Sequence, residues 1–177
     1  MTGPGPKRLG VAGGMAAGLA ITLLGLLWPG LARGPADLGA RLSAWLACDL
    51  AAAFWLAVAV ARLARHRFFS DADIDGALAA GTPRAAVLQS LIQNTLEQAV
   101  LAFVAYGAWL LVPGAHTPIA SAWIAVACFS VGRLLFFVGY SRGAAARALG
   151  FALTFYPTVG LLLASAIRLL APPPGVS

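Results

Sequence analysis

The sequence predicts an all-α integral membrane protein, and its composition is the first reason. Of the 177 residues, 60% are hydrophobic and 10% are charged, whereas about 25% of residues are charged in soluble domains. The second reason is a set of five long apolar stretches, because a helix needs about 20 apolar residues to cross the hydrocarbon core of a bilayer. The third is the turn chemistry that separates these stretches. Together these observations exclude a soluble domain.

The five apolar stretches predict five transmembrane helices, which cover residues 9–28, 42–61, 86–112, 118–140 and 148–170. Turn-forming residues follow three of them: Pro29-Gly30 after the first, Pro113-Gly114 after the third and Ser141-Arg142-Gly143 after the fourth. The second stretch is followed by a long polar connection, residues 62–84. We therefore expect two parts. Residues 1–41 form an N-terminal part with one helix, and residues 42–177 form a membrane domain with four helices.

The first stretch follows Lys7 and Arg8, as the apolar segment of a cleaved signal peptide would. It is longer than the usual segment of about 7 to 15 apolar residues. It also contains Gly10, Gly14 and Gly18 at four-residue spacing, which places three positions without side chains on one face of a helix. Such a face allows close approach of a neighbouring helix. We therefore expect a retained helix that packs against the others.

The distribution of positive charge predicts the orientation, because cytoplasmic loops are enriched in Lys and Arg. A cytoplasmic N-terminus places eight cationic residues inside and two, Arg33 and Arg41, outside; the eight are Lys7, Arg8, Arg62, Arg65, Arg67, Arg84, Arg142 and Arg147. We expect an inner (plasma) membrane protein with its site on the cytoplasmic side. The formal charge of +6 does not indicate nucleic acid, since the basic residues are scattered between apolar runs.

Polar side chains at membrane depth are the strongest indicators of function in this sequence, because they are costly unless paired or solvated. The third stretch contains Gln93, Asn94 and Glu97, and their spacing places Asn94 and Glu97 along one face. The fourth contains Arg133 and Tyr140, seven residues apart and therefore also on one face. The two helices run in opposite directions, which brings Glu97 and Arg133 to a similar depth. We predict a contact between them.

The remaining ionisable residues favour structural interpretations. Asp49 and Arg168 lie toward the outer ends of their stretches, where a structural ion pair is expected. The loop 71–76 begins like a calcium-binding EF-hand, but Thr82 stands at the twelfth position, where a bidentate carboxylate is required. The two histidines are isolated, and both cysteines lie inside apolar runs. We therefore expect no metal site.

The polar residues of the third and fourth stretches form a longer pattern. Residues 94–97 read Asn-Thr-Leu-Glu, residues 133–140 read Arg-Leu-Leu-Phe-Phe-Val-Gly-Tyr, and Arg147 follows seven residues later. With the long first and short second cytoplasmic loops, this pattern resembles the MAPEG family, the membrane-associated proteins in eicosanoid and glutathione metabolism. The resemblance covers roughly residues 42–170. It implies a MAPEG-like four-helix bundle that assembles as a homotrimer, with the N-terminal transmembrane helix as an addition.

The resemblance also implies glutathione as the co-substrate, bound between subunits near the cytoplasmic face. Arg147 matches the arginine that holds the glutathione sulfur as a thiolate, which is physically reasonable because a guanidinium lowers the pKa of a thiol. That residue is therefore the expected catalytic residue. Glutathione binding is assigned to six further polar residues: Gln93, Asn94, Glu97, Arg133, Tyr140 and Arg142.

Two functions remain open. The first is a membrane-bound glutathione-dependent transferase or peroxidase that acts on lipophilic electrophiles. The alternative is a non-catalytic membrane protein of the same fold that binds a lipid or a membrane-protein partner. Ser90 and Phe136 favour the alternative, because they stand where the family pattern has an arginine and a tyrosine. A transporter predicts inverted repeats or interrupted helices, and the sequence shows neither.

Overall fold

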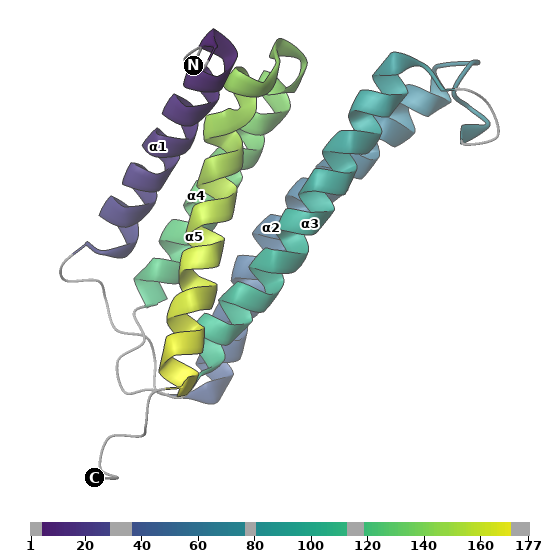
Figure 1. The fold of residues 1–177 in the computed structure, drawn as a ribbon. Coiled ribbons are helices and arrows are strands. Elements are labelled where there is room, and N and C mark those ends of the chain that lie inside the picture. The colour runs from purple at the N-terminus through teal and green to yellow at the C-terminus, as the bar shows by residue number, and fades with distance from the viewer. Residues whose placement is uncertain (1–4, 29–36, 77–80, 113–118, 171–177) are drawn as a thin grey trace, which may run out of the picture.

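The computed structural model describes residues 5–28, 37–76, 81–112 and 119–170, and these ranges contain five α-helices and no β-strand (Figure 1). The helices are α1 (Pro6–Leu26), α2 (Leu38–Phe68), α3 (Pro83–Leu111), α4 (Ile119–Gly139) and α5 (Ala144–Leu170). A short 3₁₀ helix, η2 (Tyr140–Arg142), joins α4 to α5. The predicted all-α fold is confirmed.

The second and third helices extend further than the apolar stretches from which they were predicted. The sequence predicts an end at residue 61, but α2 continues to Phe68. α3 begins at Pro83, after the N-cap residue Thr82, whose hydroxyl accepts a hydrogen bond from the Ala85 amide. Proline is well suited to the first position of a helix. Hydropathy marks where a helix leaves the bilayer rather than where its hydrogen bonding stops, and this explains the difference.

The helices form two groups (Figure 1). α2 and α3 lie side by side as one pair, and α1, α4 and α5 form the other group. α3 contacts α5 and α2 contacts α4, so the two groups share a common interior. They diverge toward the end of the molecule where η2 and the connection between α2 and α3 lie. The candidate site is at this end.

Small residues allow α4 and α5 to pack closely. A Cβ atom on Gly132 of α4 would lie 2.7 Å from the carbonyl oxygen of Gly150 in α5, which is closer than real Cβ contacts. Glycine is therefore required at this crossing. Close packing of small residues is a common way for helices to associate in membranes.

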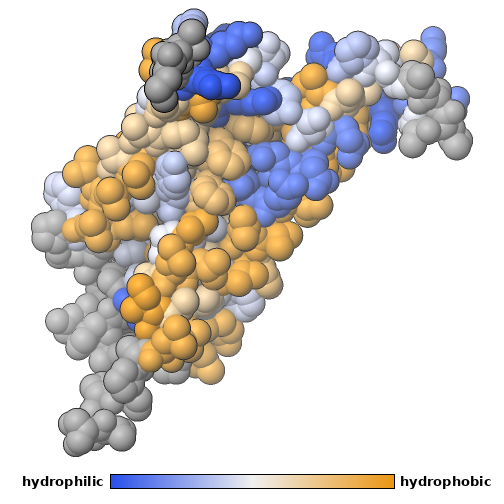
Figure 2. All heavy atoms as spheres, viewed as in Figure 1, coloured by the Kyte–Doolittle hydropathy of each residue, from blue (hydrophilic) through white to orange (hydrophobic). Residues whose placement is uncertain are grey.

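Four of the five helices are long and apolar enough to span a membrane: α1, α2, α4 with η2, and α5. α3 is as long but carries four polar side chains in its middle, Gln93, Asn94, Glu97 and Gln98. Hydrophobic residues cover most of the surface in Figure 2, whereas hydrophilic residues gather at the diverging end and over part of α3. An extended apolar surface of this kind suits contact with lipid. The protein is a multi-pass integral membrane protein.

Asp73 organises the connection between α2 and α3. Its carboxylate accepts hydrogen bonds from the Thr82 hydroxyl at 2.6 Å and the Thr82 amide at 2.7 Å. Ser70 Oγ also donates to it at 3.0 Å, and His66 Nε2 lies 2.8 Å away. The hydrogen bonds from Thr82, followed by those from Ser70 and His66, lower the pKa of Asp73 to about 2. The loop that begins like an EF-hand therefore uses its central aspartate to hold the start of α3.

Candidate functional site

A cavity of about 410 Å³ lies where α1, α3, α4, η2 and α5 meet, and we call it the Arg147 cavity. Three residues predicted from the sequence contribute to it from three different elements: Asn94 of α3, Tyr140 of η2 and Arg147 of α5. All three are half-buried. The other lining residues are small or apolar: Val11, Met15, Phe136, Ala144, Ala148 and Phe151.

The turn at η2 brings Arg147 back over Tyr140. Gly143 ends η2 with φ 99°, a left-handed conformation that glycine adopts without strain. α5 then begins at Ala144, which places Arg147 in its first turn. The Arg147 guanidinium carbon lies 4.3 Å from the centre of the Tyr140 ring, within the range of a cation–π interaction. The two side chains therefore form one surface of the cavity.

Arg133 orients Asn94 from behind the cavity. It is completely buried, and it donates hydrogen bonds to Asn94 Oδ1 at 2.8 Å and to Thr154 Oγ1 at 2.7 Å. Because a guanidinium can only donate, it requires the oxygen of the Asn94 amide as its acceptor. The Asn94 amide nitrogen is therefore left to donate to a ligand. The predicted contact between Arg133 and Glu97 is wrong, since Asn94 takes that place.

Gln93 and Glu97 face away from the Arg147 cavity. The Gln93 amide donates to Glu97 Oε1 at 2.8 Å, and both side chains are exposed on α3. Arg142 is exposed in η2 and does not line the Arg147 cavity either. Within a single chain, three of the seven predicted site residues line this cavity and a fourth, Arg133, supports it.

The electrostatics of the Arg147 cavity favour an anion. None of the described residues that line it is acidic. Arg147 contributes one positive charge directly, and Arg133 contributes another from behind Asn94. Burial of a cation without a carboxylate partner is costly, and among the described residues Arg133 forms no salt bridge. A negatively charged ligand in the cavity would reduce this cost.

A second cavity of about 400 Å³ adjoins the first, because Tyr140 lines both. It brings Arg62 of α2 and Arg84 of α3 to the opposite side of Tyr140, together with Ser141 and Phe137. Arg62 also lies over the Phe137 ring, at 5.1 Å from its centre. The distribution of positive charge in the sequence identifies both arginines as markers of orientation. Their positions at helix ends beside a polar loop were the available signal for a role in the site.

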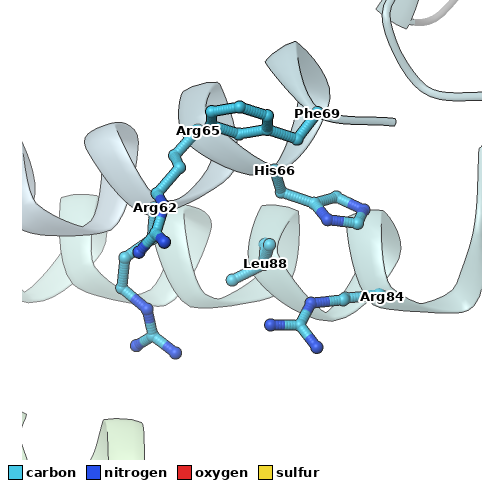
Figure 3. Close-up of a pocket in the computed structure, with 6 residues that line it drawn as sticks. All are labelled: Arg62, Arg65, His66, Phe69, Arg84 and Leu88. Carbon is cyan, nitrogen blue, oxygen red and sulfur yellow. The ribbon is translucent and has the colours of Figure 1, made fainter. Parts of the chain in front are cut away.

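Arg62 and Arg84 also line a basic pocket of about 360 Å³ between the end of α2 and the start of α3. Figure 3 shows the guanidinium groups of Arg62 and Arg65 on one side and that of Arg84 opposite, pointing toward them. The ring of His66 lies above Arg84 in this view. Among the described residues, no carboxylate forms a salt bridge with any of the three arginines. This end of the molecule is therefore strongly cationic.

Asp49 and Arg168 do not form the expected structural ion pair. Both carboxylate oxygens of Asp49 are buried and have no hydrogen-bond partner among the described residues. The guanidinium of Arg168 lies instead over the Trp109 ring, at 3.8 Å from its centre. Asp49 lines an apolar groove of about 610 Å³ between α2 and α3. Neither residue lines the Arg147 cavity.

The fold and the cavities define a class of protein: a multi-pass, all-helical membrane protein with a cationic site near one end of its bundle. A comparison with family models gives the particular family, because the model of the MAPEG family matches residues 42–167. The chain therefore belongs to the MAPEG family. The matched region begins within α2 and ends within α5, so α1 lies outside it. Comparisons with curated proteins and with solved structures gave no match.

Proposed function

We propose that the protein is a membrane-bound glutathione-dependent transferase or peroxidase that acts on lipophilic electrophiles. The MAPEG family includes such enzymes. The observation that carries the proposal is the Arg147 cavity, which combines Arg147, Tyr140 and Asn94 with no acidic residue among its described lining. A cavity of this size lies within the range of about 300 to 1,000 Å³ that is usual for small-molecule sites.

Glutathione carries two carboxylates, an ammonium group, a thiol and two amide groups, and the described residues offer partners for several of them. The Asn94 amide nitrogen is free to donate to a carboxylate or carbonyl oxygen, because Arg133 holds its oxygen. Arg62 and Arg84 are placed to bind carboxylates on the other side of Tyr140. Three predicted residues do not line the Arg147 cavity of their own chain: Gln93, Glu97 and Arg142. We propose that they contact a glutathione molecule that is bound at the boundary with a neighbouring subunit.

Arg147 is the proposed catalytic residue, because its guanidinium favours the thiolate form of the glutathione sulfur. The thiol proton passes to water, and the sulfur lone pair attacks the electrophilic carbon. With an alkyl halide, the carbon–sulfur bond forms as the carbon–halogen bond breaks and halide leaves. With an activated aryl halide, sulfur adds to the ring carbon first, and the carbon–halogen bond then breaks to release halide. With an α,β-unsaturated aldehyde, sulfur bonds to the β-carbon and water returns a proton to the α-carbon.

The peroxidase reaction uses the same thiolate. It attacks the terminal oxygen of a lipid hydroperoxide, the oxygen–oxygen bond breaks, and the alkoxide takes a proton from water to leave as an alcohol. The resulting sulfenic acid condenses with a second glutathione, which gives glutathione disulfide and water. Arg147 assists by stabilising the thiolate in both reactions.

We infer that the active assembly is a homotrimer in an inner (plasma) membrane, with the N-terminus and the site on the cytoplasmic side. The excess of arginine at the diverging end supports this orientation. The exposed Gln93 and Glu97 support the assembly, because polar side chains on a membrane helix are costly when they face lipid. A neighbouring copy would cover them.

The alternative, a non-catalytic protein that binds a lipid or a membrane-protein partner, is favoured by one different feature. The groove between α2 and α3 is larger than the Arg147 cavity and almost entirely apolar, with Asp49 as its acidic residue. Because the Asp49 carboxylate oxygens are buried, the groove presents an apolar surface that suits a lipid chain.

The two functions are separated by the thermal unfolding midpoint of the purified protein with and without millimolar glutathione. A ligand that binds only the folded state raises this midpoint. We expect a rise in the wild type and in Arg8→Ala, a control at an exposed position of α1, and no rise in Arg147→Ala. An unchanged midpoint at saturating glutathione would reject the enzyme and direct the search to lipid or protein partners.

A further inference from the structure

α1 lies outside the region that the family model matches, yet it forms one wall of the Arg147 cavity. Val11 and Met15 are one helical turn apart, and both side chains line the cavity. Other large side chains of α1, such as Leu19 and Leu24, are exposed on the outside of the molecule. One face of α1 therefore belongs to the candidate site and another to the lipid.

The contact between α1 and α5 is tight, so this wall is a fixed part of the fold. A Cβ atom on Gly10 would lie 2.9 Å from Ala145 Cβ, and one on Gly14 would lie 2.9 Å from Ala148 Cβ. A Cβ atom on Gly18 would come even closer to Ala152. No real Cβ atom approaches another this closely. The spacing predicted from the sequence as a close-packing face is thus used to dock α1 on α5.

The lining of the Arg147 cavity is divided into two sides. Polar groups come from α3, η2 and α5, as Asn94, Tyr140 and Arg147. The α1 side supplies apolar side chains, Val11 and Met15. A ligand that fits both sides has a polar or reactive group and an apolar chain. Methionine suits such a wall because its unbranched side chain adapts to irregular apolar shapes.

We propose that α1 is a specificity element of the site, and that Val11 and Met15 bind the apolar chain of the acceptor and set the chain length that the cavity accepts. The acceptor class is a linear electrophile with an alkyl chain, such as a long α,β-unsaturated aldehyde. This inference rests on the proposed glutathione-dependent activity, which places the reacting sulfur beside Arg147.

The test compares kcat/KM for a short and a long acceptor, hexenal and dodecenal, with protein in lipid nanodiscs. Met15→Trp fills the α1 side of the cavity and should lower the dodecenal-to-hexenal ratio about tenfold, because a hydrophobic pocket discriminates by roughly 10-fold or more when chain space is lost. Met15→Ala enlarges that side and should raise the ratio. Leu19→Trp, on the exposed face of the same helix, should leave it at the wild-type value.

One result would overturn the inference while glutathione still raises the unfolding midpoint and wild-type turnover is present: a dodecenal-to-hexenal ratio in Met15→Trp equal to that of Leu19→Trp. If kcat/KM falls equally for both acceptors to give that ratio, Met15 supports the fold or glutathione rather than the chain. Retention of the glutathione-induced rise in Met15→Trp separates selectivity from misfolding.

If glutathione does not raise the unfolding midpoint of the wild-type protein and no turnover is measured, the proposed function is rejected. A binding measurement would then decide the role of α1. The probe is dodecanoic acid with a diazirine at the end of its chain, cross-linked by light in nanodiscs and located by mass spectrometry. Cross-links at Val11 and Met15 that Met15→Trp removes and Leu19→Trp retains would support a chain-binding wall. Cross-links spread equally over both faces of α1 would reject it.

Discussion

Arg133 shows how a residue outside the cavity sets the chemistry inside it. Its two hydrogen bonds, to Asn94 on α3 and Thr154 on α5, join three helices at one buried point. A guanidinium contact on Asn94 Oδ1 fixes the amide so that only its nitrogen faces a ligand. The same guanidinium lies 4.6 Å from the centre of the Phe136 ring. The side chain that replaces a tyrosine of the family pattern therefore packs against the buried cation.

At the residue scale, Arg147→Ala tests the proposed catalytic role. Among the described residues, the guanidinium stacks on Tyr140 at the surface of the cavity, and we expect the bundle to remain assembled without it. Loss of one group that stabilises a developing or full negative charge typically costs about 10²- to 10³-fold in kcat. We expect a loss of this size in glutathione conjugation, measured as absorbance of the thioether product.

Arg147→Lys is the informative companion variant, because it keeps the positive charge but removes the planar guanidinium that stacks on Tyr140. We expect part of the activity to return, and Arg8→Ala to behave as wild type. A loss of assembly in Arg147→Ala, seen as aggregation during size-exclusion chromatography, would mean that the arginine is structural.

The sequence identified the polar residues of the site but not their pairing. Helix periodicity and depth placed Arg133 level with the polar part of α3, and this was sufficient to predict a contact between the two helices. Whether Asn94 or Glu97 meets Arg133 depends on the rotation of α3 about its axis, which is set by packing against α2 and α5. Likewise, the approach of Arg62 and Arg84 to Tyr140 depends on how the two helix groups diverge. The sequence alone therefore indicates only their value as markers of orientation.

At the scale of elements, the connection between α2 and α3 depends on one carboxylate. Hydrogen bonds from Thr82, Ser70 and His66 hold the pKa of Asp73 at about 2, below the ordinary value of about 3.9. A lowered pKa in the folded state means that the carboxylate stabilises the fold above about pH 4 and loses this effect as the pH falls toward 2.

Asp73→Asn should therefore lower the thermal unfolding midpoint at pH 7, and its difference from wild type should shrink between about pH 4 and pH 2. Comparison at each pH cancels the contributions of the other titrating groups. Asp71→Asn is the matched control, since Asp71 is an exposed residue of the same loop. A difference that stays constant down to pH 2 would show that ionisation of Asp73 does not support the turn.

The docking of α1 offers a second test at this scale, because its glycines differ in their surroundings. A Cβ atom on Gly18 would collide with Ala152, whereas one on Gly13 would meet nothing within 4 Å. Gly18→Ala should destabilise the protein by about 1 to 3 kcal/mol through overpacking. Gly13→Ala should be neutral or slightly stabilising, since alanine has the higher helix propensity. Thermal unfolding of the two variants in the same detergent measures the difference.

At the scale of the whole molecule, hydropathy and turn residues were sufficient to predict five helices, their order and the membrane. These properties depend on local composition, which a single sequence contains. The inclination of the α2–α3 pair relative to the other three helices was not predictable in the same way, because it follows from how α3 packs on α5 and how α2 packs on α4. The same limit applies to assembly, because a single chain does not contain the symmetry of its oligomer.

The homotrimer is therefore the prediction that most needs a direct measurement. Native mass spectrometry of the protein released from nanodiscs should show a complex of three chains of 18.1 kDa. The paired variant Gln93→Leu and Glu97→Leu should weaken this complex, because polar contacts between helices in a membrane add stability of about 1 kcal/mol each. Leu19→Ala with Leu23→Ala, at the same spacing on the exposed face of α1, should leave the complex intact. A wild-type monomer would contradict the trimer, and the exposed pair of Gln93 and Glu97 would then have to be covered by lipid headgroups or water.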